Sequence, residues 1–126
     1  DVNSNYGYQW MRSDQLWYVV DELQNNPLSR RAVISIYDGK EHENYKFDTP
    51  CTLALHYQIV DEKLCMSVMM RSNDLVFWFW NDQYTFSKLQ EVIANKLWIE
   101  CGWYHHMATN MHIYERHYNM KSNYER

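Results

Sequence analysis

Glycine and proline are scarce in this chain, with three and two copies among its 126 residues. A glycine-rich phosphate-binding loop therefore has too few residues to form from. No apolar run approaches the ~20 residues that a membrane-spanning helix needs, and no HExxH or Cys/His spacing indicates zinc. A formal net charge of −4 also lacks the basic excess of nucleic-acid and membrane-surface binders. We therefore expect no metal, no nucleic acid and no membrane among the ligands and partners.

Cysteine is also rare, and the three copies Cys51, Cys65 and Cys101 are widely spaced and odd in number. This usage is typical of a reducing compartment, so we expect a cytoplasmic protein. A phage or virus as its source stays open. The length fits a single domain over residues 1–126. Six Trp and eleven Tyr are more than such a chain can bury, so some should face a ligand or a partner.

Hydrophobic periodicity predicts a helix over residues 15–26, with Asp14 as N-cap and Pro27 ending it. A second helix is expected to begin near Asp82, because Phe86, Leu89, Ile93 and Leu97 would share one of its faces. Alternating patterns predict strands over residues 30–38, 52–60, 63–72 and 100–118, the middle two forming a hairpin around Asp61-Glu62. The apolar run 75–80 is interpreted as a buried strand or a partner-facing segment. The fold class is α/β or α+β, with a mixed or antiparallel sheet.

Cys51 follows Pro50 at the start of the predicted hairpin. A free cysteine in such a place is usually buried and inert. The partner strand, however, ends at Arg71-Ser72, where a guanidinium and a hydroxyl can bind a phosphate. A cation near a thiol lowers its pKa and raises its thiolate fraction. The residues thus leave two interpretations open: a core cysteine, or a nucleophile beside an anion site.

Five segments occur in the order of the motifs of the thymidylate synthase family, which this chain resembles: "NYGYQW", "SRR", "PC", "RSND" and "MHIY". From Cys51 to Tyr114 the family spacing holds without a gap, and the resemblance covers essentially the whole chain. It implies a thymidylate synthase-like mixed sheet with packed helices. It also implies that residues 1–126 lack the family's N-terminal part, with its catalytic Glu, and the extreme C-terminal part that closes the site.

The resemblance further implies a one-carbon transferase. Cys51 would add to C6 of a pyrimidine nucleotide monophosphate, and C5 would then attack the one-carbon unit of 5,10-methylenetetrahydrofolate. A homodimer is implied, because in the family the paired arginines reach the phosphate of the neighbouring subunit. The implied roles are phosphate binding for Arg71, Ser72, Arg30 and Arg31, sugar binding for His112 and Tyr114, a position near base and folate for Asp74, and one near the catalytic site for Tyr6.

Asp82 stands where thymidylate synthases carry an Asn that hydrogen-bonds the uracil edge. A carboxyl group suits cytosine instead, and Asp at this position is the mark of the deoxycytidylate hydroxymethylase branch. The resemblance therefore implies hydroxymethylation of dCMP or CMP. The alternatives are a dUMP enzyme that uses Asn81, a non-catalytic nucleotide-binding homologue, and a resemblance in fold alone. Met70 and Asn110 also depart from the family's usual Gln and acidic residue.

Overall fold

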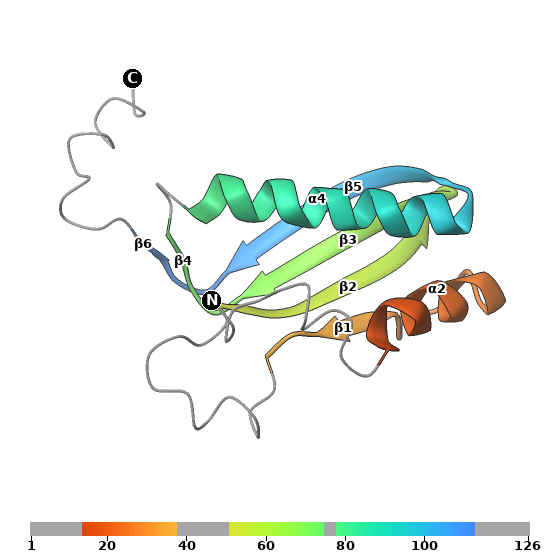
Figure 1. Cartoon of the computed structure of the whole chain (residues 1–126), viewed down its shortest axis with the longest axis horizontal. Coiled ribbons are helices and arrows are strands. Elements are labelled where there is room, and N and C mark those ends of the chain that lie inside the picture. The colour runs from red at the N-terminus through yellow and green to blue at the C-terminus, as the bar shows by residue number, and fades with distance from the viewer. Residues whose placement is uncertain (1–13, 38–50, 75–77, 113–126) are drawn as a thin grey trace.

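The computed structural model describes residues 14–37, 51–74 and 78–112, without the side chains of residues 73–74, 78–82 and 111–112 (Figure 1). Its elements are α2 (Gln15–Asn25), β1 (Val33–Ser35), β2 (Thr52–Val60), β3 (Lys63–Met70), β4 (Asn73–Asp74), α4 (Trp78–Leu97), β5 (Glu100–Ala108) and β6 (Met111–His112).

The main sheet has four strands in the order β1-β2-β3-β5. β1 and β3 each pair antiparallel with β2, whereas β5 pairs parallel with β3. A parallel pair needs a crossover connection, and α4 supplies it by running back along the sheet (Figure 1). The predicted mixed sheet of an α+β fold is therefore confirmed.

The hairpin β2–β3 turns at Asp61-Glu62, where both residues have positive φ angles, of 52° and 63°. Two central residues with φ > 0 are the signature of a type I′ turn, whose twist matches that of the flanking strands. Both side chains are exposed. The turn sets the hairpin register from Val60–Lys63 to Ala54–Met69, and an irregularity between Thr52 and Ala54 then shifts it by one residue, so that Thr52 faces Met70.

Both helices cover the same face of the sheet (Figure 1). In α2 the buried positions Val19, Val20 and Leu23 recur at helical spacing, as the periodicity predicted. Alternate residues of β3, from Leu64 to Met70, point into the same core. The fully buried core is completed by Ala32, Ile34, Ile36, Leu55, Tyr57, Phe86, Leu89, Ile93 and Ala94.

Two predictions about α4 are wrong. The helix begins at Trp78, so residues 78–80 are helical rather than a strand, and Asp82 lies inside the helix rather than at its cap. A short apolar run looks alike in a strand and a buried helix. Length decides here: 20 helical residues span about 30 Å, which matches the roughly 30 Å of the nine-residue β5. A helix starting at Asp82 would be about one turn too short.

The other boundaries differ less. Asp14 is the N-cap of α2, but it has a φ of 56° and its side chain makes no capping hydrogen bond. The helix ends at Asn25, just before Pro27. The strands predicted over 63–72 and 100–118 are both interrupted, after Met70 and after Ala108 respectively. Their continuations, β4 and β6, form a separate two-stranded parallel sheet.

Candidate functional site

Cys51 and Arg71 are neighbours across the open end of the hairpin. The backbone N–H of Arg71 donates to the carbonyl of Cys51 at 2.8 Å, one step beyond the Thr52–Met70 pair. Cys51 is half-buried and Thr52 is fully buried, so the strand start is held in place by packing. The predicted juxtaposition of the cysteine and the arginine is thus present in the backbone.

The parallel strands bring two more predicted residues to this end of the sheet. Met70 pairs with Ala108, and after the interruption Asp74 pairs with His112 in unchanged register. The backbones of Asp74 and His112 are therefore adjacent, beyond Arg71 and Ser72 (Figure 1). Sequence spacing alone does not reveal this pairing, because the strands are joined through the whole of α4.

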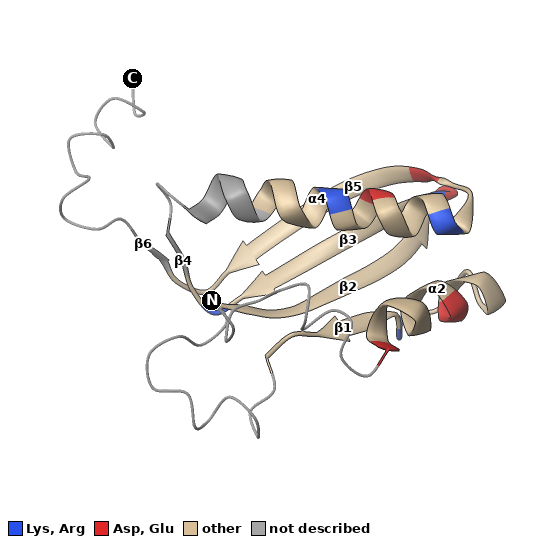
Figure 2. Cartoon of the chain, viewed as in Figure 1, with Lys and Arg blue, Asp and Glu red and all other residues tan. Residues whose placement is uncertain are grey.

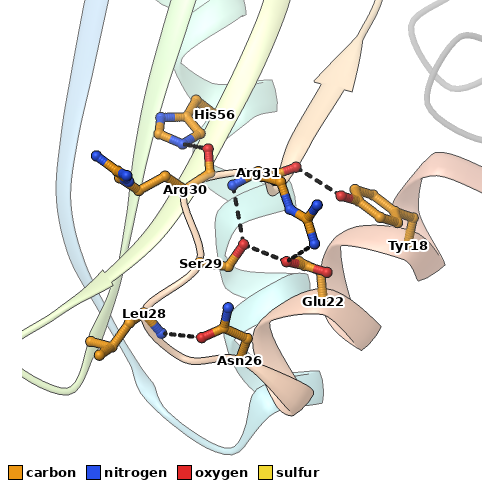
Figure 3. Close-up of polar contacts among 8 residues, drawn as sticks. All are labelled: Tyr18, Glu22, Asn26, Leu28, Ser29, Arg30, Arg31 and His56. Carbon is orange, nitrogen blue, oxygen red and sulfur yellow. Dashed lines mark hydrogen bonds and ion pairs between the residues drawn. The ribbon is translucent and has the colours of Figure 1, made fainter.

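Arg30 and Arg31 lie elsewhere on the sheet. The ring of His56 approaches the carbonyl of Arg30, with Nε2 3.2 Å from that oxygen (Figure 3). His56 is five residues along β2 from Cys51, which amounts to roughly 17 Å of strand. Within one chain the paired arginines therefore do not join Cys51 and Arg71.

A polar network holds the segment that carries these arginines (Figure 3). The hydroxyl of buried Ser29 donates to the Glu22 carboxylate and accepts from the N–H of Arg31 at 3.1 Å. The Tyr18 hydroxyl donates to the carbonyl of Arg31 at 3.0 Å. The Arg31 guanidinium lies 3.6 Å from Glu22, yet its side chain is 80% exposed. The backbone is thus fixed while the cationic group stays open to solvent, where it can meet an anion from outside the chain.

An apolar hollow of about 660 Å³ adjoins the Cys51–Arg71 end and is lined by Leu53, Met69, Met70, His106, Met107, Ala108 and Thr109. The volume falls in the range of small-molecule sites. Its lining contains neither Cys51 nor Arg71, so it borders the predicted chemistry rather than containing it.

Sequence reasoning missed three polar residues that structure this region. The Tyr104 hydroxyl lies 2.9 Å from His106 Nδ1, and burial, with a smaller contribution from His105, lowers the pKa of His106. The Thr109 hydroxyl donates to the carbonyl of Arg71 at 2.8 Å. A signal for Thr109 was present, since "TN" replaces the family's Gly-Asp before the His-x-Tyr motif.

The structure describes the remaining predicted site residues only in part. Tyr6 and Tyr114 lie outside the described residues, and of Asp74, Asp82 and His112 only the backbone is described. Within residues 14–37, 51–74 and 78–112, no three His, Cys, Asp or Glu side chains are grouped so that they could hold a metal ion. No helix in these ranges has both the length and the apolar character needed to cross a membrane.

The chain is similar to several known proteins in sequence and in structure. A thymidylate synthase of Fusobacterium nucleatum is 32% identical over 130 residues, covering 94% of this chain and 44% of that protein. A deoxyuridylate hydroxymethyltransferase of Pseudomonas phage M6 is 34% identical over 120 residues, covering 87% and 33%. The solved structure of thermostable thymidylate synthase A from Bacillus subtilis superposes with a TM-score of 0.80 at 32% identity, covering 90% of this chain and 41% of that one.

The chain thus spans less than half the length of these relatives. The family model described as thymidylate synthase matches residues 1–126, which is the entire sequence. By this match, and by the fold it shares with the Bacillus enzyme, the chain belongs to the thymidylate synthase family.

Proposed function

We propose that this chain is the nucleotide-binding and nucleophile-bearing part of a folate-dependent pyrimidine nucleotide hydroxymethyltransferase, acting on dCMP or CMP. The observation that supports it most is the backbone pair Cys51–Arg71, which brings the backbone of a cysteine next to that of a cationic residue at a strand end. Similarity to both thymidylate synthases and a deoxyuridylate hydroxymethyltransferase supports the broader chemistry, one-carbon transfer to a pyrimidine.

The proposed reaction begins with attack by the cysteine nucleophile. The Cys51 thiolate forms a bond to C6 of the pyrimidine, and the electron pair of the C5–C6 double bond moves onto C5. C5 then bonds to the methylene carbon supplied by 5,10-methylenetetrahydrofolate, and one of the two carbon–nitrogen bonds of that methylene group breaks, its electron pair passing to the folate nitrogen. Loss of the C5 proton and departure of tetrahydrofolate leave an exocyclic methylene group. Water adds to that carbon, and the sulfur leaves C6 as thiolate, so the enzyme is regenerated.

The 5′-phosphate would be held by Arg71 and Ser72, and by Arg30 and Arg31 of a second copy. The exposed guanidinium of Arg31 on a fixed backbone suits this role. Arg31 precedes β1, and its neighbour Arg30 lies beside His56, roughly 17 Å along β2 from Cys51. We therefore propose a homodimer in which each site is completed by the neighbouring subunit.

The remaining contacts concern the sugar and the base. His112 and Tyr114 would bond the 3′-hydroxyl, Asp74 would lie near the base and the folate, and Tyr6 near the reacting atoms. Asp82, in the early part of α4, would accept from the cytosine amino group through one oxygen and share a proton with N3 through the other. Asn81 is the competing base contact, and it would make the protein a dUMP enzyme.

The nucleophile is tested by trapping the adduct. A 5-fluoropyrimidine nucleotide, offered with methylenetetrahydrofolate, should become covalently attached to Cys51, and Cys51→Ser should abolish the adduct because a hydroxyl is a far weaker nucleophile than a thiolate at neutral pH. Mass spectrometry of peptides locates the modification. An adduct on Cys65 or Cys101 would overturn the assignment. Tight nucleotide binding without any adduct or turnover would instead favour the non-catalytic homologue.

The base preference is tested by titrating dCMP and dUMP into the parent and Asp82→Asn. With uracil, O4 would face a carboxylate oxygen with no proton between them, and such a mismatch costs on the order of 1–3 kcal/mol, roughly ten- to a hundredfold in affinity. The parent should prefer dCMP, less so as the pH rises and the shared proton is lost. Asp82→Asn should shift the preference toward dUMP. Equal affinities in the parent, or an unchanged ratio in the variant, would remove the cytosine assignment.

A further inference from the structure

Arg71 has an unusual backbone arrangement for a residue at a strand end. In a regular strand, the N–H and the C=O of one residue point toward the same neighbouring strand. The N–H of Arg71 bonds to Cys51, which leads into β2, whereas its C=O accepts from Thr109, which follows β5. The backbone is therefore twisted at Arg71, so that its N–H points toward the β2 side and its C=O points toward the β5 side.

Thr109 sits at the matching interruption between β5 and β6. Its backbone N–H donates to the carbonyl of Met70 at 3.1 Å, which is the last ladder bond of the main sheet. Its hydroxyl donates to the next carbonyl, that of Arg71, at 2.8 Å. One residue thus bonds two consecutive carbonyls, and beyond it the register continues unchanged into the β4–β6 pair.

The backbone N–H of Thr109 does not take the place of its hydroxyl in this arrangement. The N–H of Thr109 is already bonded to Met70, and β6 resumes only at Met111. The carbonyl of Arg71 is reached by a side-chain donor that lies close to the backbone, and Ser and Thr carry such a donor, the hydroxyl group. A glycine at this position would leave the Arg71 carbonyl without this partner.

We propose that Thr109 is a positioning residue that sets the orientation of Arg71 toward the 5′-phosphate of the nucleotide. The proposal rests on the proposed function, specifically on the phosphate role of Arg71. Thr109 itself need not touch the nucleotide. It fixes the peptide group that follows the Cα of Arg71, and thereby the direction in which the guanidinium leaves the sheet.

The experiment compares two ligands that differ only in the phosphate, dCMP and deoxycytidine, by ligand-observed NMR titration of the full chain. Thr109→Val keeps the shape and removes the donor, whereas Thr109→Ser keeps the donor. Without this hydrogen bond Arg71 is no longer held in its binding orientation, so we expect a roughly five- to tenfold weaker affinity for dCMP in Thr109→Val. The affinity for deoxycytidine should stay unchanged, and Thr109→Ser should restore dCMP binding.

The melting temperature of each variant is the control for folding, and Thr109→Ala, with less bulk, replaces the valine variant if that variant fails to fold. Equal weakening of dCMP and deoxycytidine would overturn the proposal, because a merely structural role affects both ligands. Unchanged dCMP affinity in Thr109→Val would overturn it as well. If the parent itself bound the two ligands equally, the phosphate site of the proposed function would fall first and Thr109 with it.

Discussion

His106 lies in surroundings that lower the pKa of its imidazole. It is half-buried on β5, its ring is stacked near Tyr104 with centroids 5.9 Å apart, and Nδ1 lies within hydrogen-bonding distance of the Tyr104 hydroxyl. Burial lowers the pKa of His106, and the neighbouring His105 lowers it further. The folded protein therefore favours the neutral imidazole.

The consequence is a loss of stability in acid. As the pH falls below the ordinary histidine pKa of about 6.5, the unfolded chain takes up the proton first, so the free energy of unfolding decreases until the lowered folded pKa is passed. His106→Gln keeps a polar partner for Tyr104 but does not titrate. Urea unfolding at pH 7.5 and pH 5 should show a smaller acid loss in His106→Gln than in the parent. His105→Gln should reduce the loss only slightly, and identical losses in parent and His106→Gln would contradict the assignment.

At the scale of elements, the β3–β5 pair contains a bulge that α4 stabilises. Leu64 pairs with Cys101 but Met66 pairs with Tyr104, so β5 carries one extra residue. A Cβ at Gly102 would lie 2.6 Å from the sulfur of Cys65, so the bulge also needs glycine for close approach.

Buried Gln90 of α4 bonds the carbonyls at this bulge. Its Nε2 donates to Leu64 at 2.9 Å and to Trp103 at 3.2 Å. Gln90→Leu should lower the free energy of unfolding by about 1–3 kcal/mol, because these carbonyls lose a donor that water does not readily replace. Gln24→Leu is the matched control: Gln24 is exposed and donates only a long 3.4 Å bond to Lys96, so it should change stability by less than about 0.5 kcal/mol. Urea denaturation measures both, and equal effects would refute the role of Gln90.

At the scale of the whole molecule, the two faces of the sheet differ. Among the described residues, one face is covered by α2 and α4, whereas Val33, Trp103 and Met107 on the other are partly exposed. Figure 2 shows no Lys, Arg, Asp or Glu along the central lengths of β2, β3 and β5, whereas such residues lie on the helices and at strand ends. Because two copies of such a face would not repel each other at neutral pH, it is compatible with the proposed homodimer.

If the protein is a dimer through this face, one charge introduced into the interface should dissociate it. Trp103→Asp would place a carboxylate on the face opposite the helices and should convert a micromolar dimer to monomer, since an unpaired charge in an interface is costly to desolvate. Trp98→Asp is the control, because Trp98 follows α4 and is 92% exposed. Sedimentation equilibrium gives the masses, and dCMP affinity should fall only in the Trp103 variant. A parent that sediments as monomer at micromolar concentration would contradict the dimer and leave Arg30 and Arg31 without their proposed role.

The sequence by itself determined the elements that depend on nearby residues. The periodicity of Val19, Val20 and Leu23 predicted α2, and the two-residue turn at Asp61-Glu62 predicted the hairpin. The hairpin also predicted that Cys51 and Arg71 lie near each other, in many registers. Their direct backbone bond depends in addition on the irregularity between Thr52 and Ala54, which the turn does not set.

Only the tertiary structure decided the contacts that cross α4. Three features depend on the length of the α4 crossover between β3 and β5. They are the start of the helix at Trp78, the pairing of Asp74 with His112, and the bond from Thr109 to Arg71. A short apolar run has no periodicity that separates strand from helix, and a parallel register is not set by any local turn. Packing of the helix against the whole length of β3 and β5 makes that choice, and with it the environment of the phosphate-binding end.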